Sequence, residues 1–122
     1  MPENTDVERR RSPRIEILAQ AEIMGQEIRI MQVLNISMGG IFLVGNPDEY
    51  PDLMPGIDLD LAISTTEGGM GDDPDANIAC HARIVRVDHG EQNKRPPGFG
   101  ATIEPVDDEN RERLTMLLLR TG

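Results

Sequence analysis

The sequence predicts a mainly β fold, a six-stranded antiparallel β-barrel followed by a C-terminal α-helix. Apolar and polar residues alternate in several short stretches, these stretches recur at regular spacing between turn residues, and only the last segment has helical spacing. Six strands in this order favour a small barrel with the helix as a lid. The length of 122 residues suits one domain with a modest core.

The first half of the chain contains three predicted strands. Apolar residues of one parity predict a strand over residues 15–23, and Gly25-Gln26 fits a tight hairpin turn. A second strand is expected over residues 28–36. Residues 37–40 then form a sharp turn before a short apolar strand at 41–44.

The second half contains three further strands that are separated by polar loops. We expect loops at 45–56, 65–75 and 89–97, and strands at 57–64, 76–88 and 98–103. The loop at 65–75 is rich in Gly and Asp, so we expect it to be mobile and acidic.

A C-terminal helix is predicted over residues 107–121. Acidic residues stand at its start and Arg120 near its end, and both complement the helix dipole. Leu114, Leu117 and Leu118 follow at helical spacing. Residues 116–119 are all apolar and cover more than one face, so part of the helix is expected to meet a partner or a second copy.

Composition sets several further expectations. Trp is absent and there are two Phe and one Tyr, so the core must be aliphatic. The single cysteine, Cys80, cannot form an internal disulfide, which fits a reducing compartment. No apolar run approaches the roughly 20 residues that span a bilayer. We therefore expect a cytoplasmic protein with a disordered tail over residues 1–8 and one domain over residues 9–122.

An arginine cluster, R-R-R-S-P-R, occupies residues 9–14 of a chain that is otherwise acidic. The net charge is −10, with 22 acidic against 12 basic residues, and four of the basic residues lie in this cluster. The far field of such a chain repels nucleic acid and anionic membranes. A local cationic site on an acidic body suits one small anion better than a polymer. The alternative interpretation is an N-terminal solubility arm.

A second polar cluster, N-I-S-M-G-G, follows at residues 35–40. Asn35 and Ser37 offer hydrogen-bonding groups, and Gly39 and Gly40 permit positive φ and close approach of a ligand to the backbone. Together with the arginines, this cluster fits a compact ligand with phosphates and a guanine edge. Without the arginines, the same residues would describe a capped turn between strands.

These clusters resemble the sequence pattern of the PilZ domain family. Arg10 and Arg14 match its R-x-x-x-R motif, and Asn35, Ser37 and Gly40 match [D/N]-x-S-x-x-G one hairpin later. The continuation G-G-I-F-L, the later G-F-G-A-T-I and the terminal helix also fit. The resemblance covers nearly the whole chain from residue 9 onward.

The resemblance implies a PilZ-like barrel that binds cyclic di-GMP, as a monomer or as an intercalated dimer. It implies a receptor or adaptor that changes conformation and regulates an unidentified partner protein, with motility, exopolysaccharide or virulence as output. It implies no catalytic activity, no metal and no further cofactor. The implied ligand-binding residues are Arg9, Arg10, Arg14, Asn35, Ser37, Gly39 and Gly40.

Arginine suits this ligand because its fork geometry bridges guanine O6 and N7, and because it also stacks on bases. Arg10 and Arg14 are the expected partners of a phosphate and a guanine Hoogsteen edge. Arg9 could stack on an extra base, which would favour the dimeric ligand, whereas we interpret Arg11 as a solvent-facing charge. The arm is expected to become ordered with the ligand, and Pro13 lowers that cost.

Three other functions compete with this prediction. The first is a nucleotide-independent PilZ-type interaction module. The second is a nucleic-acid-binding barrel, which the acidic charge and the scarcity of aromatic residues oppose. The third is an enzyme, for which we find no metal-binding or nucleophilic set. Cys80 and His81 are adjacent on a predicted strand, so they point to opposite faces and cannot easily share a metal.

Overall fold

A computed structural model describes residues 19–25, 27–65, 77–92 and 94–121. The predicted tail at 1–8, the arginine arm at 9–14 and the first residues of the predicted strand at 15–23 lie outside the described residues. So does the loop at 65–75, apart from its first residue.

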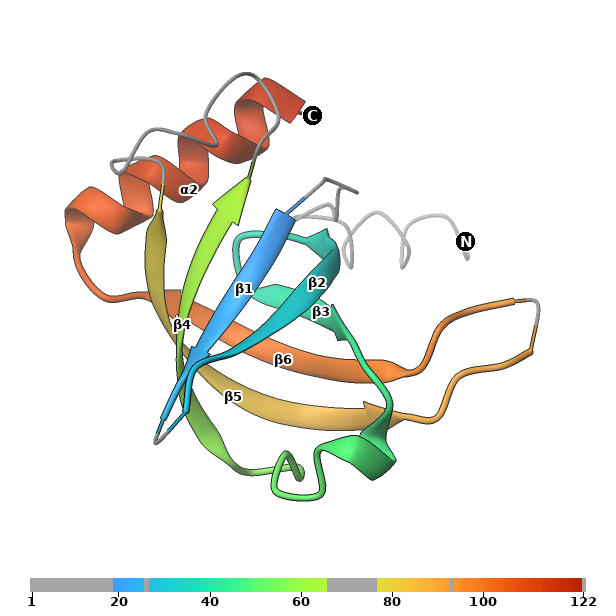
Figure 1. Ribbon diagram of the computed structural model, residues 1–122. Helices are drawn as coiled ribbons and strands as arrows, with labels where there is room; N and C mark the ends of the chain where they lie inside the picture. The colour runs from blue at the N-terminus through green and yellow to red at the C-terminus, as the bar shows by residue number, and fades with distance from the viewer. Residues whose placement is uncertain (1–18, 26, 66–76, 93, 122) are drawn as a thin grey trace, which may run out of the picture.

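Six strands form a closed antiparallel barrel, and one α-helix follows them (Figure 1). In chain order the elements are β1 (Ala19–Met24), β2 (Arg29–Ile36), β3 (Gly40–Val44), the 3₁₀ helix η1 (Pro47–Glu49), β4 (Asp58–Thr65), β5 (Ile78–Asp88), β6 (Gly98–Pro105) and α2 (Asp108–Thr121). Around the barrel the strand order is β1-β2-β3-β6-β5-β4, and β4 pairs with β1 to close it. The predicted barrel with a C-terminal helix is confirmed.

The alternating sequence pattern fills the barrel as predicted. On β5 the residues at every second position, Ile78, Cys80, Ala82 and Ile84, are all buried. Strand β1 alternates in the same way, whereas β3 and the first half of β6 each bury four consecutive residues, and the aliphatic side chains form one central cluster with Phe99. This cluster excludes water without Trp, because branched side chains from all six strands interdigitate.

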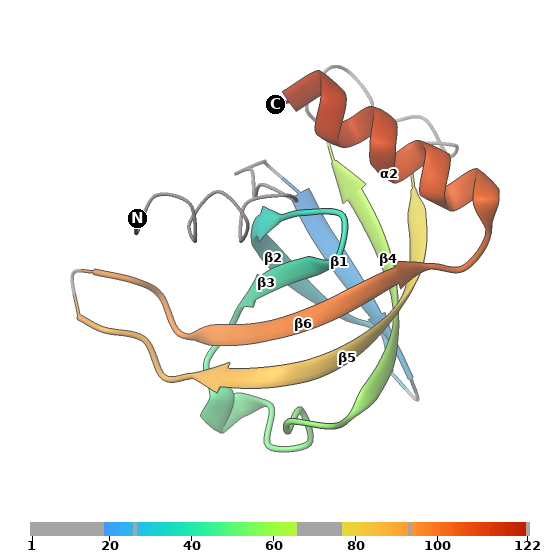
Figure 2. The same cartoon turned by 180° about the vertical axis from the view of Figure 1, so that it is seen from behind.

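Strand β6 is longer than predicted. It continues to Pro105, where Glu104 pairs with His81 and Pro105 pairs with Cys80 (Figure 2). Proline removes one hydrogen-bond donor, so it is tolerated here at the last residue of the strand.

The predicted loop at 45–56 contains the short helix η1, which the sequence analysis missed. The Asn46 side chain accepts a hydrogen bond of 3.0 Å from the Asp48 N–H, and Pro47 occupies the first helical position. Both features favour a helix start. Leu53, which follows, is only 2% exposed and anchors the loop to the core.

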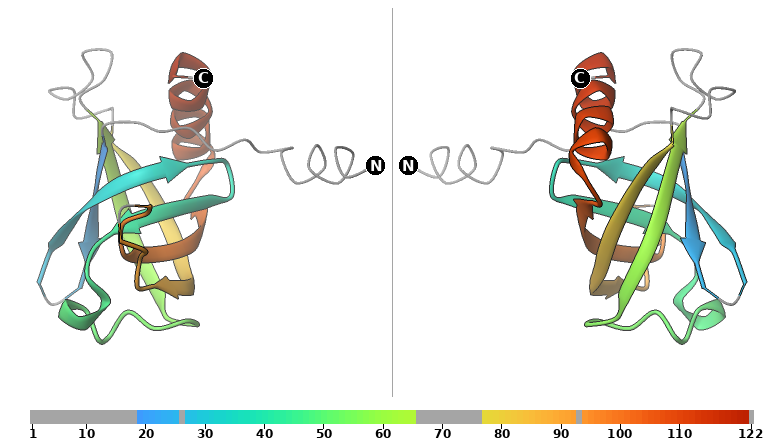
Figure 3. Two further views of the ribbon diagram at one scale, coloured as in Figure 1. Left: turned by 90° about the vertical axis from the view of Figure 1, so that its right-hand side faces the viewer. Right: turned by 90° about the vertical axis from the view of Figure 1, so that its left-hand side faces the viewer.

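Helix α2 stands at one end of the barrel and packs against β5 and β6 (Figure 3). Leu114 and Leu117 are buried, whereas Met116 is 53% and Leu119 is 73% exposed. The apolar run therefore divides between core and surface, as its length predicted. No helix among the described residues is both long enough and apolar enough to cross a bilayer.

The start of α2 is fixed by two polar residues. The Asp107 carboxylate accepts hydrogen bonds from the Asn110 N–H at 2.9 Å and from its Nδ2 at 2.7 Å, and these bonds lower the pKa of Asp107. The buried Asn110 Oδ1 accepts a 2.8 Å bond from the Ala79 N–H. Asn110 thus connects the helix cap to strand β5.

Two β-bulges interrupt the strand register. One lies in β2, where Leu34 is inserted between Val33 and Asn35, and the other lies in β5, where Val85 is inserted between Ile84 and Arg86. A bulge bends its strand and redirects the next side chain. Both bulges therefore affect how side chains leave the outer face of the barrel.

Candidate functional site

The turn between β2 and β3 brings the second polar cluster to one corner of the barrel. Here the Ser37 N–H donates a 2.8 Å hydrogen bond to the Gly40 carbonyl, and the Ser37 hydroxyl lies 3.4 Å from the same oxygen. The Gly39 carbonyl accepts a 3.2 Å bond from the Ile103 N–H of β6. The corner is therefore tied both to itself and to the adjacent strand.

The two glycines of this corner do not use positive φ. Among the described glycines, the left-handed conformation occurs at Gly56 and Gly90 instead. Gly40 begins β3 and is buried, whereas a Cβ added to Gly39 would meet no atom within 4 Å. Gly39 is consequently not required by the fold, and the space beside it is open.

Asn35 lies on the outer face of β2, two residues before Ser37. It pairs with Phe42 of β3, while the neighbouring pair Ile36–Ile41 points into the core. The bulge at Leu34 sets this orientation, since without the extra residue Asn35 would follow the opposite parity. The predicted residues Asn35, Ser37, Gly39 and Gly40 thus lie close together at the β2–β3 turn, where Gly39 is exposed, Asn35 is half-buried, and Ser37 and Gly40 are buried.

The start of β1 lies beside the same corner. Ala19 pairs with Val33, which is only two residues from Asn35 along β2. Arg14 precedes Ala19 by five residues, and five residues span at most about 18 Å. Arg9, Arg10 and Arg14 lie outside the described residues, but their point of attachment is adjacent to the corner.

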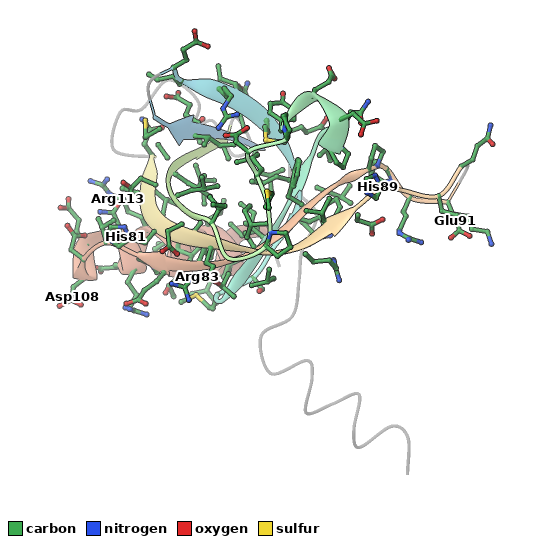
Figure 4. All side chains as sticks on the ribbon, turned by 90° about the horizontal axis from the view of Figure 1, so that it is seen from below. His81, Arg83, His89, Glu91, Asp108 and Arg113 are labelled. Atoms are coloured by element: carbon green, nitrogen blue, oxygen red, sulfur yellow. The ribbon has the colours of Figure 1, made fainter. Side chains whose placement is uncertain are left out.

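A groove of about 600 Å³ runs along the outer face of β4, β5 and β6. Two exposed pairs cross it, Arg83 Nε with Asp58 Oδ1 at 2.8 Å and His81 Nδ1 with Asp60 Oδ1 at 2.7 Å. His81 and Arg83 are labelled in Figure 4. The guanidinium of Arg83 lowers the pKa of Asp58. These groups satisfy one another, so the groove presents little unpaired charge to a ligand.

Cys80 and His81 lie on opposite faces of β5, as predicted. Cys80 is fully buried and burial raises its pKa to about 11, whereas His81 is exposed. A thiol with that pKa is protonated at neutral pH and is a poor nucleophile. In the part of the chain that the structure describes, no three His, Cys, Asp or Glu side chains are grouped to hold a metal ion.

The sequence analysis did not single out Phe42 and Arg86, which share the outer face with Asn35. The Arg86 guanidinium carbon lies 5.9 Å from the centroid of the Phe42 ring. The glycine spacing in G-F-G at 98–100 was the available signal, because small residues on one face of a strand leave room for neighbouring side chains.

Comparison with known proteins agrees with this geometry. The family model of the PilZ domain matches residues 8–120, which includes both polar clusters. A search of curated proteins finds no match.

Solved structures share the fold at low sequence identity. The chain is similar to the motility inhibitor MotI/DgrA of Bacillus subtilis, with a TM-score of 0.70 and 20% identity over 92% of this chain and 50% of that one. Similarity to the PilZ domain of YcgR from Escherichia coli, solved with c-di-GMP, has a TM-score of 0.62 and 15% identity over 93% and 91%.

The Klebsiella pneumoniae MrkH–c-di-GMP complex gives a TM-score of 0.67 and 15% identity over 89% of this chain and 50% of that one. The chain thus spans about half the length of the MotI and MrkH chains. From the family match and the barrel topology together, we conclude that the chain belongs to the PilZ domain family.

Proposed function

We propose that this protein is a cytoplasmic receptor for cyclic di-GMP that regulates a partner protein. The observation that carries the proposal is the β2–β3 corner, where Asn35, Ser37, Gly39 and Gly40 gather beside the attachment point of the arginine arm. Successive members of this set are separated by no more than one residue in the chain, so they lie within reach of one small ligand.

The chemistry of the corner complements a guanine nucleotide. The Asn35 amide both donates and accepts, and the Ser37 hydroxyl can do the same, while the space on the side-chain side of Gly39 is open. The corner carries no cation of its own between residues 35 and 40. The phosphates of the ligand are therefore the natural partners of Arg10 and Arg14.

The family and the residues support a receptor role rather than catalysis. The family match is to a ligand-binding module, and a mechanism of hydrolysis would need metal-binding carboxylates or histidines near the corner. We propose that the signal passes to a separate protein that distinguishes the ligand-bound surface from the free one.

Isothermal titration calorimetry with cyclic di-GMP tests the receptor role. We expect saturable binding with micromolar affinity, near −8 kcal/mol. Two or three charge-assisted hydrogen bonds of about 1.5–3 kcal/mol each contribute to this together with stacking of arginine on the bases, and ordering of the arm opposes it. Absence of heat at about 100 μM ligand, where a micromolar site saturates, would contradict the proposal, and GMP is the control for nonspecific guanine binding.

Substitution of Gly39 by Ala separates the ligand-binding role of the corner from its role in the fold. An added Cβ meets nothing within 4 Å, so we expect an unchanged melting temperature. The same methyl group occupies the space that a ligand would approach, so we expect the Kd to rise at least tenfold, about 1.4 kcal/mol.

Gly25→Ala is the matched control, because its added Cβ would lie at an ordinary 3.8 Å from the Glu27 carbonyl, in the β1–β2 turn. This variant should bind like the wild type. If Gly39→Ala also binds like the wild type, the ligand does not approach this part of the corner.

A further inference from the structure

A row of four residues crosses the outer face of β2, β3, β6 and β5. Asn35 pairs with Phe42, Phe42 pairs with Gly100, and Gly100 pairs with Arg86. Residues on either side of the row, such as Ile41 and Phe99, point inward and are fully buried. The row therefore connects the β2–β3 corner to the guanidinium of Arg86, which is distant from the corner in sequence.

Both ends of this row are set by β-bulges. Leu34 is the extra residue directly before Asn35, and Val85 is the extra residue directly before Arg86. Bulges redirect side chains and are frequent beside binding sites. Here they turn Asn35 and Arg86 onto the same face, where they flank Phe42.

The Arg86 side chain lies across Gly100 toward the Phe42 ring. A Cβ added to Gly100 would come within 3.3 Å of Arg86 Nε, and the guanidinium carbon is 5.9 Å from the ring centroid. The absence of a side chain at Gly100 is what lets the arginine extend over β6. The cation–π contact holds the guanidinium in place and leaves its N–H groups available at the edge.

Arg86 differs from Arg29 and Arg83 in making no direct carboxylate contact, although the pKa of the nearby Asp88, lowered first by its hydrogen bond from Arg95, is also lowered by the charge of Arg86. Arg29 pairs with Asp52 and Arg83 with Asp58, whereas within the described ranges Arg86 forms no ion pair. Asp88, two residues along β5 on the same face, directs one oxygen to the Gly90 N–H at 2.8 Å and the other to Arg95 at 2.9 Å. In a chain with 22 acidic residues, a preoriented guanidinium without a direct ion pair is available for an anionic ligand.

We propose that Arg86, held by Phe42, is a further ligand-binding residue that donates in fork geometry to the cyclic di-GMP bound at the β2–β3 corner. This inference rests on the proposed function. Phe42 lies directly opposite Asn35, and cross-strand neighbours have Cβ atoms about 5 Å apart. Phe42 is itself only 5% exposed, so a nucleotide anchored at Asn35 would pass beside its covered ring to reach the guanidinium of Arg86.

Titration of Arg86→Ala with cyclic di-GMP tests the inference. Loss of charge-assisted bonds should raise the Kd about 10- to 100-fold. Arg86→Lys, which keeps the charge but loses the fork, should recover only part of the affinity. Lys94→Ala is the charge control and should leave the Kd within twofold. Lys94 lies 3.5 Å from Glu91, which Figure 4 shows on the projecting β5–β6 hairpin.

The possible outcomes separate this inference from the proposed function. Wild-type binding together with an Arg86→Ala variant that binds within twofold, and that melts cooperatively like the wild type, overturns the role of Arg86 alone. An Arg86→Lys variant with full affinity overturns the fork geometry. A wild-type protein that does not bind cyclic di-GMP overturns both proposals.

Discussion

Replacing Arg10 or Arg14 by Ala is expected to raise the Kd for cyclic di-GMP by about 10- to 100-fold, and replacing both should abolish measurable binding. Each arginine is proposed to make charge-assisted bonds of about 1.5–3 kcal/mol to a phosphate or to a guanine edge. Removing two such partners brings a micromolar site to the millimolar range or weaker. Calorimetry with the wild type measured alongside gives the change directly.

Arg11→Ala is the matched control for these variants. It removes the same charge from the same arm, but the motif spacing does not include Arg11. If the arginines act only through net charge, then Arg10→Ala and Arg11→Ala will weaken binding equally, and the slope of log Kd against log salt will change by the same amount. A specific site predicts that only Arg10→Ala and Arg14→Ala have a large effect.

The second large effect is expected at Gly98, where an alanine should destabilise the fold by about 3 kcal/mol. A Cβ at Gly98 would collide with the Leu43 carbonyl oxygen and would lie 2.6 Å from Cε2 of Phe42. The carbonyl belongs to the β3–β6 ladder, so it cannot move aside without loss of strand pairing. Thermal unfolding should show a melting temperature lower on the order of 10 °C.

Gly100→Ala is the control for this overpacking, because it lies on the same strand and the same face. Its added Cβ would meet only the Arg86 side chain, at 3.3 Å from Nε, and a long side chain can shift. We expect a loss below about 1 kcal/mol. Equal destabilisation by the two variants would indicate that β-propensity, and not the Leu43 contact, determines the cost of alanine here.

The barrel could be predicted because several of its strands alternate between buried and exposed positions. In β5 the buried residues Ile78, Cys80, Ala82 and Ile84 alternate with the more exposed Ala79, His81 and Arg83, and one buried face is enough to fix the strand and its register. The corner was predictable for a different reason, since Asn35, Ser37 and Gly40 are close in sequence and a turn keeps them close in space.

The bulges and the contacts that depend on them could not be predicted. A bulge residue such as Val85 shifts the inward–outward alternation of the side chains by one position. The sequence pattern does not show how the partner strand pairs with the residues before and after this shift. The contact of Arg86 with Phe42 requires the registers of β3 with β6 and of β6 with β5 together. The link from Asn110 to Ala79 is likewise a long-range polar contact that no local pattern indicates.

Closure of the barrel restricts how any effector can recognise this protein. Each of the six strands is hydrogen-bonded to two neighbours, so the described sheet presents no continuous free edge onto which another chain could add a strand. On the described residues, recognition without strand addition would use protruding side chains, such as those on the exposed flank of α2 at Met116 and Leu119. The side chains on this surface can change without any change in the barrel that carries them.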